Sequence, residues 1–582
     1  MYRYSEIIAA AQQAPAARSA VDRAALASVF GRADLAGLVA ELRADAASAE
    51  PLPDLPYRLF RTYVHDGDRY GFEGRYFARR RRLNSTAVVA LAEGGEENFA
   101  RLSDVLWAIC DEYSWAVPAH HRFNTTLDLG YHRCIDLFAA ETAHALSEIV
   151  AAAGDDLEEP VRRRVIDNVR HRVLDAFADE PRARWWETGT NNWAAVCAGS
   201  IGMAALAIED DPLRLAAILH RVQDTMAAFL SGFTADGGCP EGMGYWVYGY
   251  GYFAYYAEAL RERTGMDLLA GTEKVAAFPA AVDFGDGRCV SFSDDPGGAV
   301  PPTGLMSRVR DRLGVRLPQI TRLSSFDDDH CYRWAHLTRT LLWTDPAVIG
   351  GAVPRGTTWL PDLAWVIDRG DVGSAAVMFA AKGGHNDEPH NHLDLGSFIL
   401  AVDGVQVLAD LGAGVYDADY FGPNRYRALH NSAAGHSVPV VDGVEQRVGA
   451  DAAATVEEFR SDDSGIHLAL DASAAYGGLE VRRGFDYDRR GRLEVTDRFG
   501  RRGSPLEELF MCRVPPRVAD GAVEWRTGAA VVRLELGGDW DVSVETIDTF
   551  DHRAKPETVY RLRLKGTTAA ERAFAFEVSS GQ

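Results

Sequence analysis

The stretch SFILAVDGVQVLADLG, residues 397–412, indicates how the second half of the chain folds. Two apolar runs flank Asp403-Gly404, and an Asp-Gly pair in this setting is a strong signal of a β-hairpin. Comparable turns follow at 488–491 in LEVRRGFDYDRRGRLEVTDRF and at Gly537-Gly538 in VVRLELGGDWDVSVETI, each between runs that alternate with period two. Many short strands at this spacing predict antiparallel sheets packed as a β-sandwich.

The first half of the chain has the periodicity of helices instead. LRLAAILHRVQDTMAAFL, residues 213–230, places its apolar side chains on one stripe, and Asp211 with Pro212 fit an N-cap and a first helical position. The alanine-rich segments 135–150 and 192–209 repeat this pattern. An all-helical array is therefore expected at the start of the chain.

The boundary between the two halves follows from a change in composition and in hydrophobic periodicity. The stretch SDDPGGAVPPTG, residues 293–304, is rich in glycine and proline, which opposes a helix through it. We expect an α+β chain with a helical domain over 1–350, including a linking region over about 270–350, and an antiparallel β domain over 351–582.

Composition limits the classes of function. The chain has 582 residues and a formal net charge of −23, which argues against a protein that binds nucleic acid or an anionic membrane. Seven cysteines without a CxxC pair indicate reduced thiols. The start, MYRYSEIIAAAQQAP, lacks the pattern of a signal peptide, and no apolar window is long enough for a membrane span. We expect a cytoplasmic protein.

The segment with the most side chains that can bind a metal or transfer a proton is GGHNDEPHNHLDLGSF, residues 383–398. It contains His385, Asp387, Glu388, His390, His392 and Asp394. If the chain is extended here, His390, His392 and Asp394 share one face. Imidazoles two residues apart can bind a metal, or one can bind it while the other reaches a substrate. The alternative is a polar surface loop whose histidines form local hydrogen bonds.

Further candidate metal ligands follow this segment. Asp410 ends the second strand of the expected hairpin, and HNSAAGHSVPVVDG supplies His430 and His436. A His, Asp, His set from separate strands would fit a Zn²⁺ site whose fourth position is open or filled by water.

Three patches in the helical half are also unusual. WWETGTNNWAAVC (185–197) puts Asn191 and Asn192 where a loop becomes a helix, and CDEYSWAVPAHHRF (110–123) offers Trp115 and His120. DGGCPEGMGYWVYGYGYFAYY (236–256) is rich in glycine and tyrosine, and aromatic rings can stack on sugar faces. Most of these tyrosines are expected to pack helices, and we prefer that reading for Tyr250, Tyr252, Tyr255 and Tyr256.

Taken together, these segments resemble the heparinase II/III-like polysaccharide lyases. The matching pieces are CDEYSWAVPAH, DLFAAETA, TNNWAAVC, DGGCPEGMGYWVYG, GGHNDEPHNHLDLGSF, LADLGAGVY and NSAAGHSVPVVDG, in the family's order over roughly residues 110–445. The resemblance implies an incomplete (α/α) toroid, then an antiparallel β-sandwich, with a cleft between them. It also implies β-elimination at a uronate. That reaction needs the carboxylate neutralised, a base for the α-proton and an acid for the leaving oxygen.

The resemblance assigns catalytic roles residue by residue. It implies that Asn191, and Asn192 beside it, polarise the substrate carboxylate, and that Tyr245 donates a proton to the glycosidic oxygen and can serve as base; Tyr248 is the fallback. His390 looks like the histidine that faces the substrate. Tyr420 resembles the tyrosine that some members use as base, with Tyr416 and Tyr426 as competitors.

The resemblance also implies a structural zinc ion and a substrate-binding set. His392, Asp410 and His436 look like the family's zinc ligands, which hold the strands that present His390. The expected substrate-binding residues are Trp115, His120, Trp193, Glu241, Tyr248 and His385, of which Glu241 more simply orients its loop.

Two features depart from the family. Several members have a histidine beside the asparagine motif where this chain has Trp193, so His120 or His121 would have to take that place. The missing signal peptide suggests, by analogy with oligoalginate lyases, an exolytic enzyme that finishes imported oligosaccharides.

Two rivals differ in class from a lyase. A glycoside hydrolase would need a pair of carboxylic acids, for which Glu187 and Glu241 are the candidates. A non-catalytic protein would bind oligouronates without releasing a product. The expected partner is a uronate-containing oligo- or polysaccharide, with no nucleic acid or membrane. The sequence leaves open which polymer is cut (alginate, heparan sulfate, hyaluronate or another), endo or exo action, and whether the chain forms a homodimer.

Overall fold

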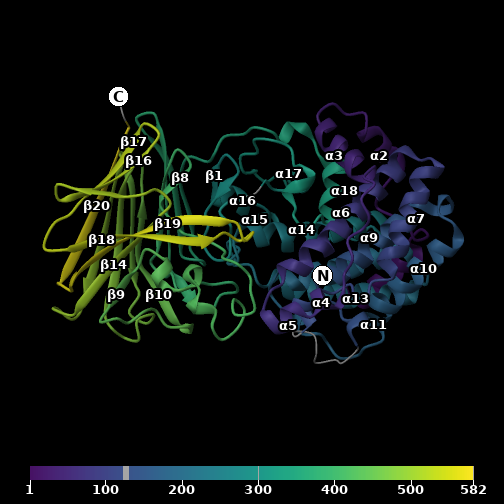
Figure 1. Ribbon diagram of the computed structural model, residues 1–582, viewed down its shortest axis with the longest axis horizontal. Coiled ribbons are helices and arrows are strands. Elements are labelled where there is room, and N and C mark those ends of the chain that lie inside the picture. The colour runs from purple at the N-terminus through teal and green to yellow at the C-terminus, as the bar shows by residue number, and fades with distance from the viewer. Residues whose placement is uncertain (122–129, 299, 581–582) are drawn as a thin grey trace. The chain divides into compact units, whose positions relative to one another are not determined.

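The computed structural model describes residues 1–121, 130–298 and 300–580 (Figure 1). The chain divides into two compact units. The helical unit comprises Met1–Phe233, Tyr245–Ala276 and Val300–Gly350, and the strand unit comprises Thr234–Gly244, Ala277–Ala299 and Gly351–Gln582.

Two short segments that the sequence analysis assigned to the helical domain therefore belong to the strand unit. Polar contacts explain the grouping. The backbone N–H of Asp236 donates to Asp362 at 3.1 Å, and the backbone N–H of Asp362 donates back to Asp236 at 3.0 Å. Arg369 donates from Nε to the carbonyl of Asp283 at 2.6 Å. These bonds join segments more than 80 residues apart, which periodicity alone does not reveal.

The helical unit forms where the apolar stripes predicted helices. Asp211 caps α13 by accepting the backbone N–H groups of Leu213 and Arg214, as the sequence indicated. The α-helices of this unit are α1 (Tyr4–Gln13), α2 (Arg23–Val29), α3 (Ala36–Ala46), α4 (Tyr57–Phe60), α5 (Thr62–Asp66), α6 (Tyr70–Glu93), α7 (Glu96–Cys110), α8 (Pro118–His121), α9 (Leu137–Ala153), α10 (Glu159–Val169), α11 (Asp175–Ala178), α12 (Asn192–Ile208), α13 (Pro212–Leu230), α14 (Met243–Thr264), α15 (Glu273–Ala276), α17 (Thr303–Leu313) and α18 (Trp334–Trp343).

The strand unit consists mainly of antiparallel sheets. Its elements are α16 (Phe278–Val282), β1 (Asp283–Gly285), β2 (Arg288–Cys289), β3 (Gly356–Leu360), β4 (Trp365–Val372), β5 (Ala375–Lys382), β6 (Gly384–Asn386), β7 (Phe398–Val402), β8 (Val405–Leu408), β9 (Pro439–Val441), β10 (Gly449–Ser461), β11 (Gly465–Asp471), β12 (Val481–Asp488), β13 (Arg492–Phe499), β14 (Pro505–Cys512), β15 (Arg517–Ala519), β16 (Ala522–Thr527), β17 (Ala530–Glu535), β18 (Asp541–Phe550), β19 (Pro556–Thr567) and β20 (Glu571–Ser580).

Three larger sheets make up this unit. A nine-stranded sheet has the order β15-β16-β17-β20-β13-β12-β11-β10-β6, a four-stranded sheet has β18-β19-β14-β9, and a five-stranded sheet has β3-β4-β5-β7-β8. The predicted hairpin is present as β7 and β8, where Val402 pairs with Val405 around Asp403-Gly404. One apolar cluster, which includes Phe398, Phe485 and Phe510, draws side chains from all three sheets and holds them together.

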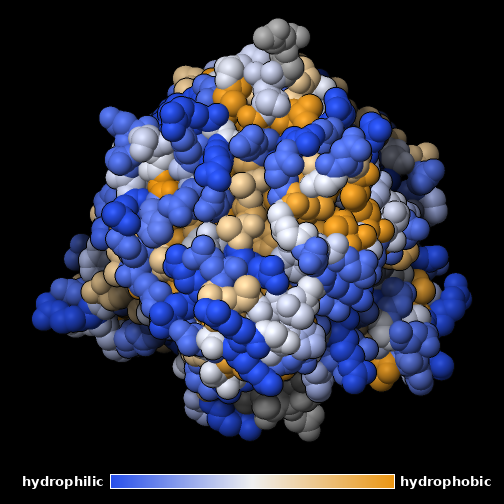
Figure 2. All heavy atoms as spheres, turned by 90° about the vertical axis from the view of Figure 1, so that its left-hand side faces the viewer, coloured by the Kyte–Doolittle hydropathy of each residue, from blue (hydrophilic) through white to orange (hydrophobic). Residues whose placement is uncertain are grey.

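The outer surface of the strands is polar. In β12 the burial alternates strictly along the strand, which gives one face to the core and one to water. Figure 2 shows that hydrophilic residues predominate on one side of the molecule, with hydrophobic residues in separate patches. Among the residues that the structure describes, no helix has both the length and the apolarity needed to cross a membrane.

Candidate active site and metal centre

The chain turns within residues 383–398 and does not stay extended. Residues 387–397 belong to no strand, and His390 has a left-handed backbone with φ 61°. The expectation that His390, His392 and Asp394 share one face of a strand is therefore wrong. Asp394 instead accepts two hydrogen bonds from Lys382 Nζ, at 2.8 and 2.9 Å, deep in the core.

The three expected metal ligands do come together. One ligand atom from each of His392, Asp410 and His436 lies within 4.8 Å of the other two, and all three residues are buried. We call these residues the metal trio. His392 Nδ1, His436 Nδ1 and Asp410 Oδ2 form no hydrogen bond with any described residue, although His436 Nδ1 and Asp410 Oδ2 lie 3.2 Å apart. Buried polar atoms without partners are rare, so three that converge indicate a cation site.

The other side-chain atoms of the trio are fixed by neighbours. His392 Nε2 lies 2.8 Å from Asp294 Oδ1, and His436 Nε2 lies 2.8 Å from the carbonyl of His430. Both acceptors require a proton on Nε2, which leaves the Nδ1 lone pair of a neutral ring for a metal. Two imidazoles and one carboxylate fit Zn²⁺ with a fourth position for water.

Electrostatics favour a metal ligand at His392. Burial lowers the pKa of His392, which favours the neutral imidazole that a metal requires. Without a metal, Asp410 and His436 stabilise each other's charge: against the effect of burial, His436 holds the pKa of Asp410 below its usual value, and Asp410 raises the pKa of His436. A metal would therefore have to displace the proton on His436 Nδ1.

Asp294 is the central residue of this cluster that sequence reasoning missed. Its side chain is fully buried, yet it contacts His390 Nδ1 at 2.6 Å, His392 Nε2 at 2.8 Å and Arg425 Nη2 at 3.1 Å, and it accepts the hydroxyl of Tyr420. Burial would raise its pKa, but Arg425 and the histidines hold the pKa well below the usual range. The only signal in the sequence was an acidic pair beside the apolar run of VSFSDD.

Among the three competing tyrosines, Tyr420 is the one whose hydroxyl donates to Asp294 in the described contacts. Tyr426 donates to Asn391 Oδ1 at 2.9 Å, and Tyr416 packs its ring against Tyr420 with 4.6 Å between centroids. Burial raises the pKa of Tyr420 well above its usual value. The hydroxyl is thus a hydrogen-bond donor to Asp294 in the resting protein.

The remaining strand-unit residues divide into two groups. Glu241 is buried, and its Oε2 lies 3.4 Å from His390 Nε2, so it faces the opposite edge of the ring from Asp294. His385 lies in β6 opposite Ala453, and its Nδ1 accepts the backbone N–H of Asp387 at 3.3 Å. The hydrogen bonds described for His385 therefore lie outside the cluster around Asp294.

In the helical unit, the asparagine pair starts α12. Asn191 is the N-cap and accepts the backbone N–H of Trp193 at Oδ1, 3.2 Å away, which leaves the amide Nδ2 as a donor. The ring of Trp193 lies between Trp185, 4.9 Å away, and His120, 4.8 Å away. His120 Nδ1 is 2.8 Å from Asp136. His120 thus contacts both Asp136 and the ring of Trp193.

Trp115 and Tyr248 are core residues in this structure. Trp115 is 2% exposed and donates its indole N–H to the carbonyl of Ile109 at 3.0 Å, so a substrate-binding role for it is corrected to packing. Tyr248 is buried beneath Arg333, and burial raises its pKa well above its usual value. Tyr245 in the first turn of α14 is half-buried.

The packing interpretation of the other four tyrosines of α14 is confirmed. Tyr250, Tyr252, Tyr255 and Tyr256 are each at most 1% exposed. Tyr250 shares a 2.7 Å hydrogen bond with Thr272, and Tyr255 lies 2.9 Å from His336 Nδ1.

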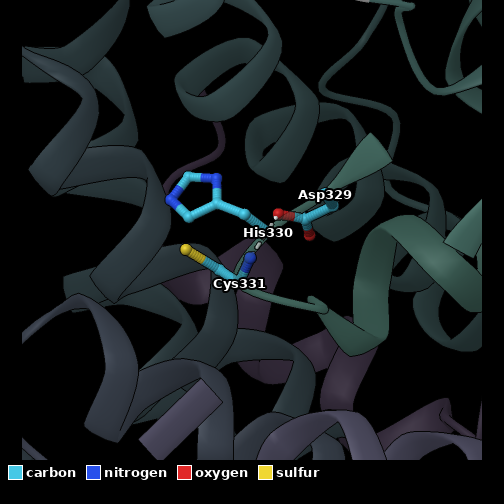
Figure 3. A group of neighbouring side chains, drawn as sticks. All are labelled: Asp329, His330 and Cys331. Atoms are coloured by element: carbon cyan, nitrogen blue, oxygen red, sulfur yellow. Dashed lines mark hydrogen bonds between the residues drawn. The ribbon is translucent and has the colours of Figure 1, made fainter. Parts of the chain in front are cut away.

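A second group of potential ligands, Asp329, His330 and Cys331, is a poor metal site (Figure 3). Both oxygens of the Asp329 carboxylate are already engaged: Oδ1 accepts the backbone N–H of Cys331 at 3.1 Å and Arg333 Nη1 at 2.6 Å, and Oδ2 accepts the backbone N–H of Arg333 at 2.7 Å. Burial raises the pKa of Cys331 well above its usual value, which disfavours the thiolate that binds metal. We assign this group to anchoring Arg333.

Comparisons with known proteins agree with this geometry. Residues 352–567 match the model of the family "Heparinase II/III-like, C-terminal". Among curated proteins, no sequence matches the chain.

Several solved structures share the fold. Heparinase III is 13% identical, with a TM-score of 0.61 and coverage of 88% of this chain and 78% of that chain. The heparan sulfate lyase HepC from Pedobacter heparinus is 14% identical, with a TM-score of 0.56 and coverage of 94% and 88%. The chondroitin AC lyase from Streptomyces coelicolor A3, solved with chondroitin sulphate, is 12% identical, with a TM-score of 0.51 and coverage of 94% and 83%. At such identities the likeness establishes the fold alone, and the match over residues 352–567 identifies a heparinase II/III-like C-terminal domain in the strand unit of this chain.

Proposed function

We propose that the protein is a lyase that cleaves uronic-acid-containing glycans by β-elimination. The observation that carries this proposal is the cluster of His390, Tyr420 and Asp294 beside the metal trio, within a heparinase II/III-like domain. A histidine and a tyrosine held by one buried carboxylate are groups suited to proton transfer.

The chemistry of elimination assigns a role to each candidate. Removal of the proton next to a carboxylate becomes feasible only when that carboxylate is neutralised by donors. Asn191, through its amide Nδ2, and Asn192 are proposed to supply those donors. His390 is the proposed base of the strand unit, with Tyr420, which is buried and has a raised pKa, as the alternative base. Tyr245 is proposed to protonate the leaving oxygen.

The metal trio has a supporting role in this proposal. Zn²⁺ bound there would tie together the segments that carry His392, Asp410 and His436, and would stabilise the fold around His390. An incomplete (α/α) toroid for the helical unit, a β-sandwich for the strand unit, and exolytic action on oligosaccharides are parts of the same proposal. A ladder of products by chromatography would contradict exolytic action.

One observation disfavours the hydrolase. Glu187, one of its two candidate acids, is buried and bound by Arg184 and by Arg221, whose Nε lies 2.5 Å away. Each oxygen of this carboxylate is held by a guanidinium group, so neither is free to reach a glycosidic oxygen.

The two chemistries differ in their use of water. Cleavage in water enriched in heavy oxygen is expected to give unlabelled glycosidic ends, because elimination adds no water across the bond. A labelled reducing end would identify hydrolysis and contradict the proposal.

A further inference from the structure

Asp294 connects the metal trio with the two proposed base residues of the strand unit. Its Oδ1 accepts from His392 Nε2 and from the Tyr420 hydroxyl, and its Oδ2 accepts from His390 Nδ1 and Arg425 Nη2. An ionised carboxylate only accepts hydrogen bonds, so each of these four neighbours must present a proton to it. By binding His390 at Nδ1, Asp294 directs Nε2 of that ring toward Glu241. By binding His392 at Nε2, it directs Nδ1 of that ring toward the other ligands of the metal trio.

Arg425 holds this carboxylate in place. Its Nη2 also donates to the carbonyl of Asn391 at 3.0 Å, and its guanidinium lies 4.7 Å from the centre of the Tyr420 ring. Asn391 lies between His390 and His392 in the chain. One arginine thus fixes Asp294, the tyrosine ring and the backbone that carries both histidines.

The backbone on both sides of this contact is in an unusual conformation. Ser293, which precedes Asp294, has φ 63°, and His390 has φ 61°. A left-handed backbone is strained in a residue other than glycine, and such conformations persist where neighbouring contacts impose them. The hydrogen bond between Asp294 and His390 joins these two strained positions.

We propose that Asp294 is a positioning residue that couples the metal trio to His390 and Tyr420, so that metal affinity and turnover depend on one carboxylate. The catalytic part of this inference rests on the proposed function, and the metal part does not. Asp294 is fully buried, so it acts through its neighbours and leaves substrate contact to them. Neighbours that orient a metal-binding histidine in this way commonly change metal affinity or activity by about 10–100-fold.

The test compares Asp294→Asn with Asp295→Asn. Asparagine has the size of aspartate but replaces one accepting oxygen with an NH₂ group, which cannot accept from His390, His392 or Tyr420. Asp295 is a matched control, because it is also buried, and the structure describes its carboxylate as accepting the backbone N–H groups of Gly244 and Gly297, each at 2.7 Å.

Zinc affinity is measured by competition with a chelator. The values of kcat and KM are measured separately, with zinc at a saturating concentration. Asp294→Asn is expected to weaken zinc binding by about 10–100-fold and, with zinc saturating, to lower kcat by about the same factor while KM stays unchanged. Asp295→Asn is expected to bind zinc like the wild type. Unchanged zinc affinity in Asp294→Asn would overturn the coupling, and full kcat at saturating zinc would overturn the positioning of His390 and Tyr420.

A measurement on the wild type covers the case in which Asp294→Asn does not fold. Zinc is titrated into the metal-free chain, and the histidine side-chain resonances are followed by NMR, with His390→Asn used for assignment. The His390 signal is expected to shift together with that of His392, while His467, which bonds Asp486 on β12, stays constant. An unmoved His390 signal would overturn the coupling. This arm needs no substrate, so it separates failure of the inference from failure of the lyase proposal.

Discussion

At the scale of single residues, the account depends on which atoms of a side chain are already engaged. Asn191 Oδ1 accepts the N–H of Trp193, and this leaves Nδ2 to donate to a substrate carboxylate. Tyr245 is half-buried at the start of α14, whereas Tyr256 of the same helix is buried and its hydroxyl has no hydrogen-bond partner among the described residues. These differences allow matched substitutions.

Asn191→Asp is expected to preserve folding and to lower kcat/KM by about 10²–10³-fold. Aspartate caps helices as well as asparagine does, but it replaces the donor with a negative charge facing a carboxylate. Steady-state kinetics and thermal melting check this together. Asp211→Asn, the reverse exchange at the N-cap of α13, serves as control and should keep full activity. Unchanged kcat/KM in Asn191→Asp would remove Asn191 from the mechanism.

Tyr245→Phe is expected to lower kcat by about 10²–10⁴-fold, because it removes only a proton-transferring hydroxyl. Substrate binding, measured by calorimetry, should persist. Tyr256→Phe is the matched control and should leave turnover intact. If Tyr245→Phe retains full kcat, the proton donor is another residue.

Glu141 gives a pH-dependent prediction. Burial, opposed by Arg333, raises its pKa to about 7, whereas an unfolded chain has about 4.3. The folded state therefore binds this proton more tightly, and the stability gained at low pH is lost as the pH rises from about 4 through 7. Between about pH 5 and pH 8 the melting temperature of the wild type should fall more than that of Glu141→Gln. Parallel curves for the two proteins would contradict this.

At the scale of secondary-structure elements, the metal trio comes from three separate parts of the strand unit. His392 precedes β7, Asp410 follows β8, and His436 follows a short turn at Ala433–Gly435. Metal binding would therefore hold these segments together, and its free energy would add to the stability of the folded chain.

His392→Ala is expected to lower zinc content and the melting temperature together. Chelation should lower the melting temperature of the wild type but have little effect on the variant, because its site is already disrupted. Elemental analysis and calorimetry measure the two quantities. His467→Ala, at a histidine on β11, should retain the wild-type zinc content. Equal zinc content in His392→Ala and the wild type would refute the assignment.

Sequence periodicity predicted the helices and strands of this chain better than the long-range contacts between them. The apolar stripe of 213–230 and the Asp403-Gly404 hairpin were both confirmed, because each depends on neighbours a few residues apart. Asp294 was missed since its partners lie 96 to 131 positions away. The extended conformation expected at His390 was wrong because a single left-handed residue turns the chain there. Burial of Trp115 is likewise a tertiary property that a motif does not show.

At the scale of the whole molecule, the two units contribute different groups to the proposed reaction. The helical unit carries Asn191 and Tyr245, and the strand unit carries His390, Tyr420 and the metal trio. A net charge of −23 means that the substrate carboxylate must be met by local donors such as asparagine, because the protein has no overall positive charge to attract an anionic glycan.

The most direct measurement follows ultraviolet absorbance while the zinc-loaded protein is incubated with a panel of uronate oligosaccharides, including alginate, heparan sulfate, hyaluronate and chondroitin fragments. β-Elimination creates a conjugated double bond, so the account predicts a steady rise with at least one member and a rise at least about 100-fold slower with Tyr245→Phe. Cleavage of a panel member without any rise in absorbance would contradict the lyase mechanism.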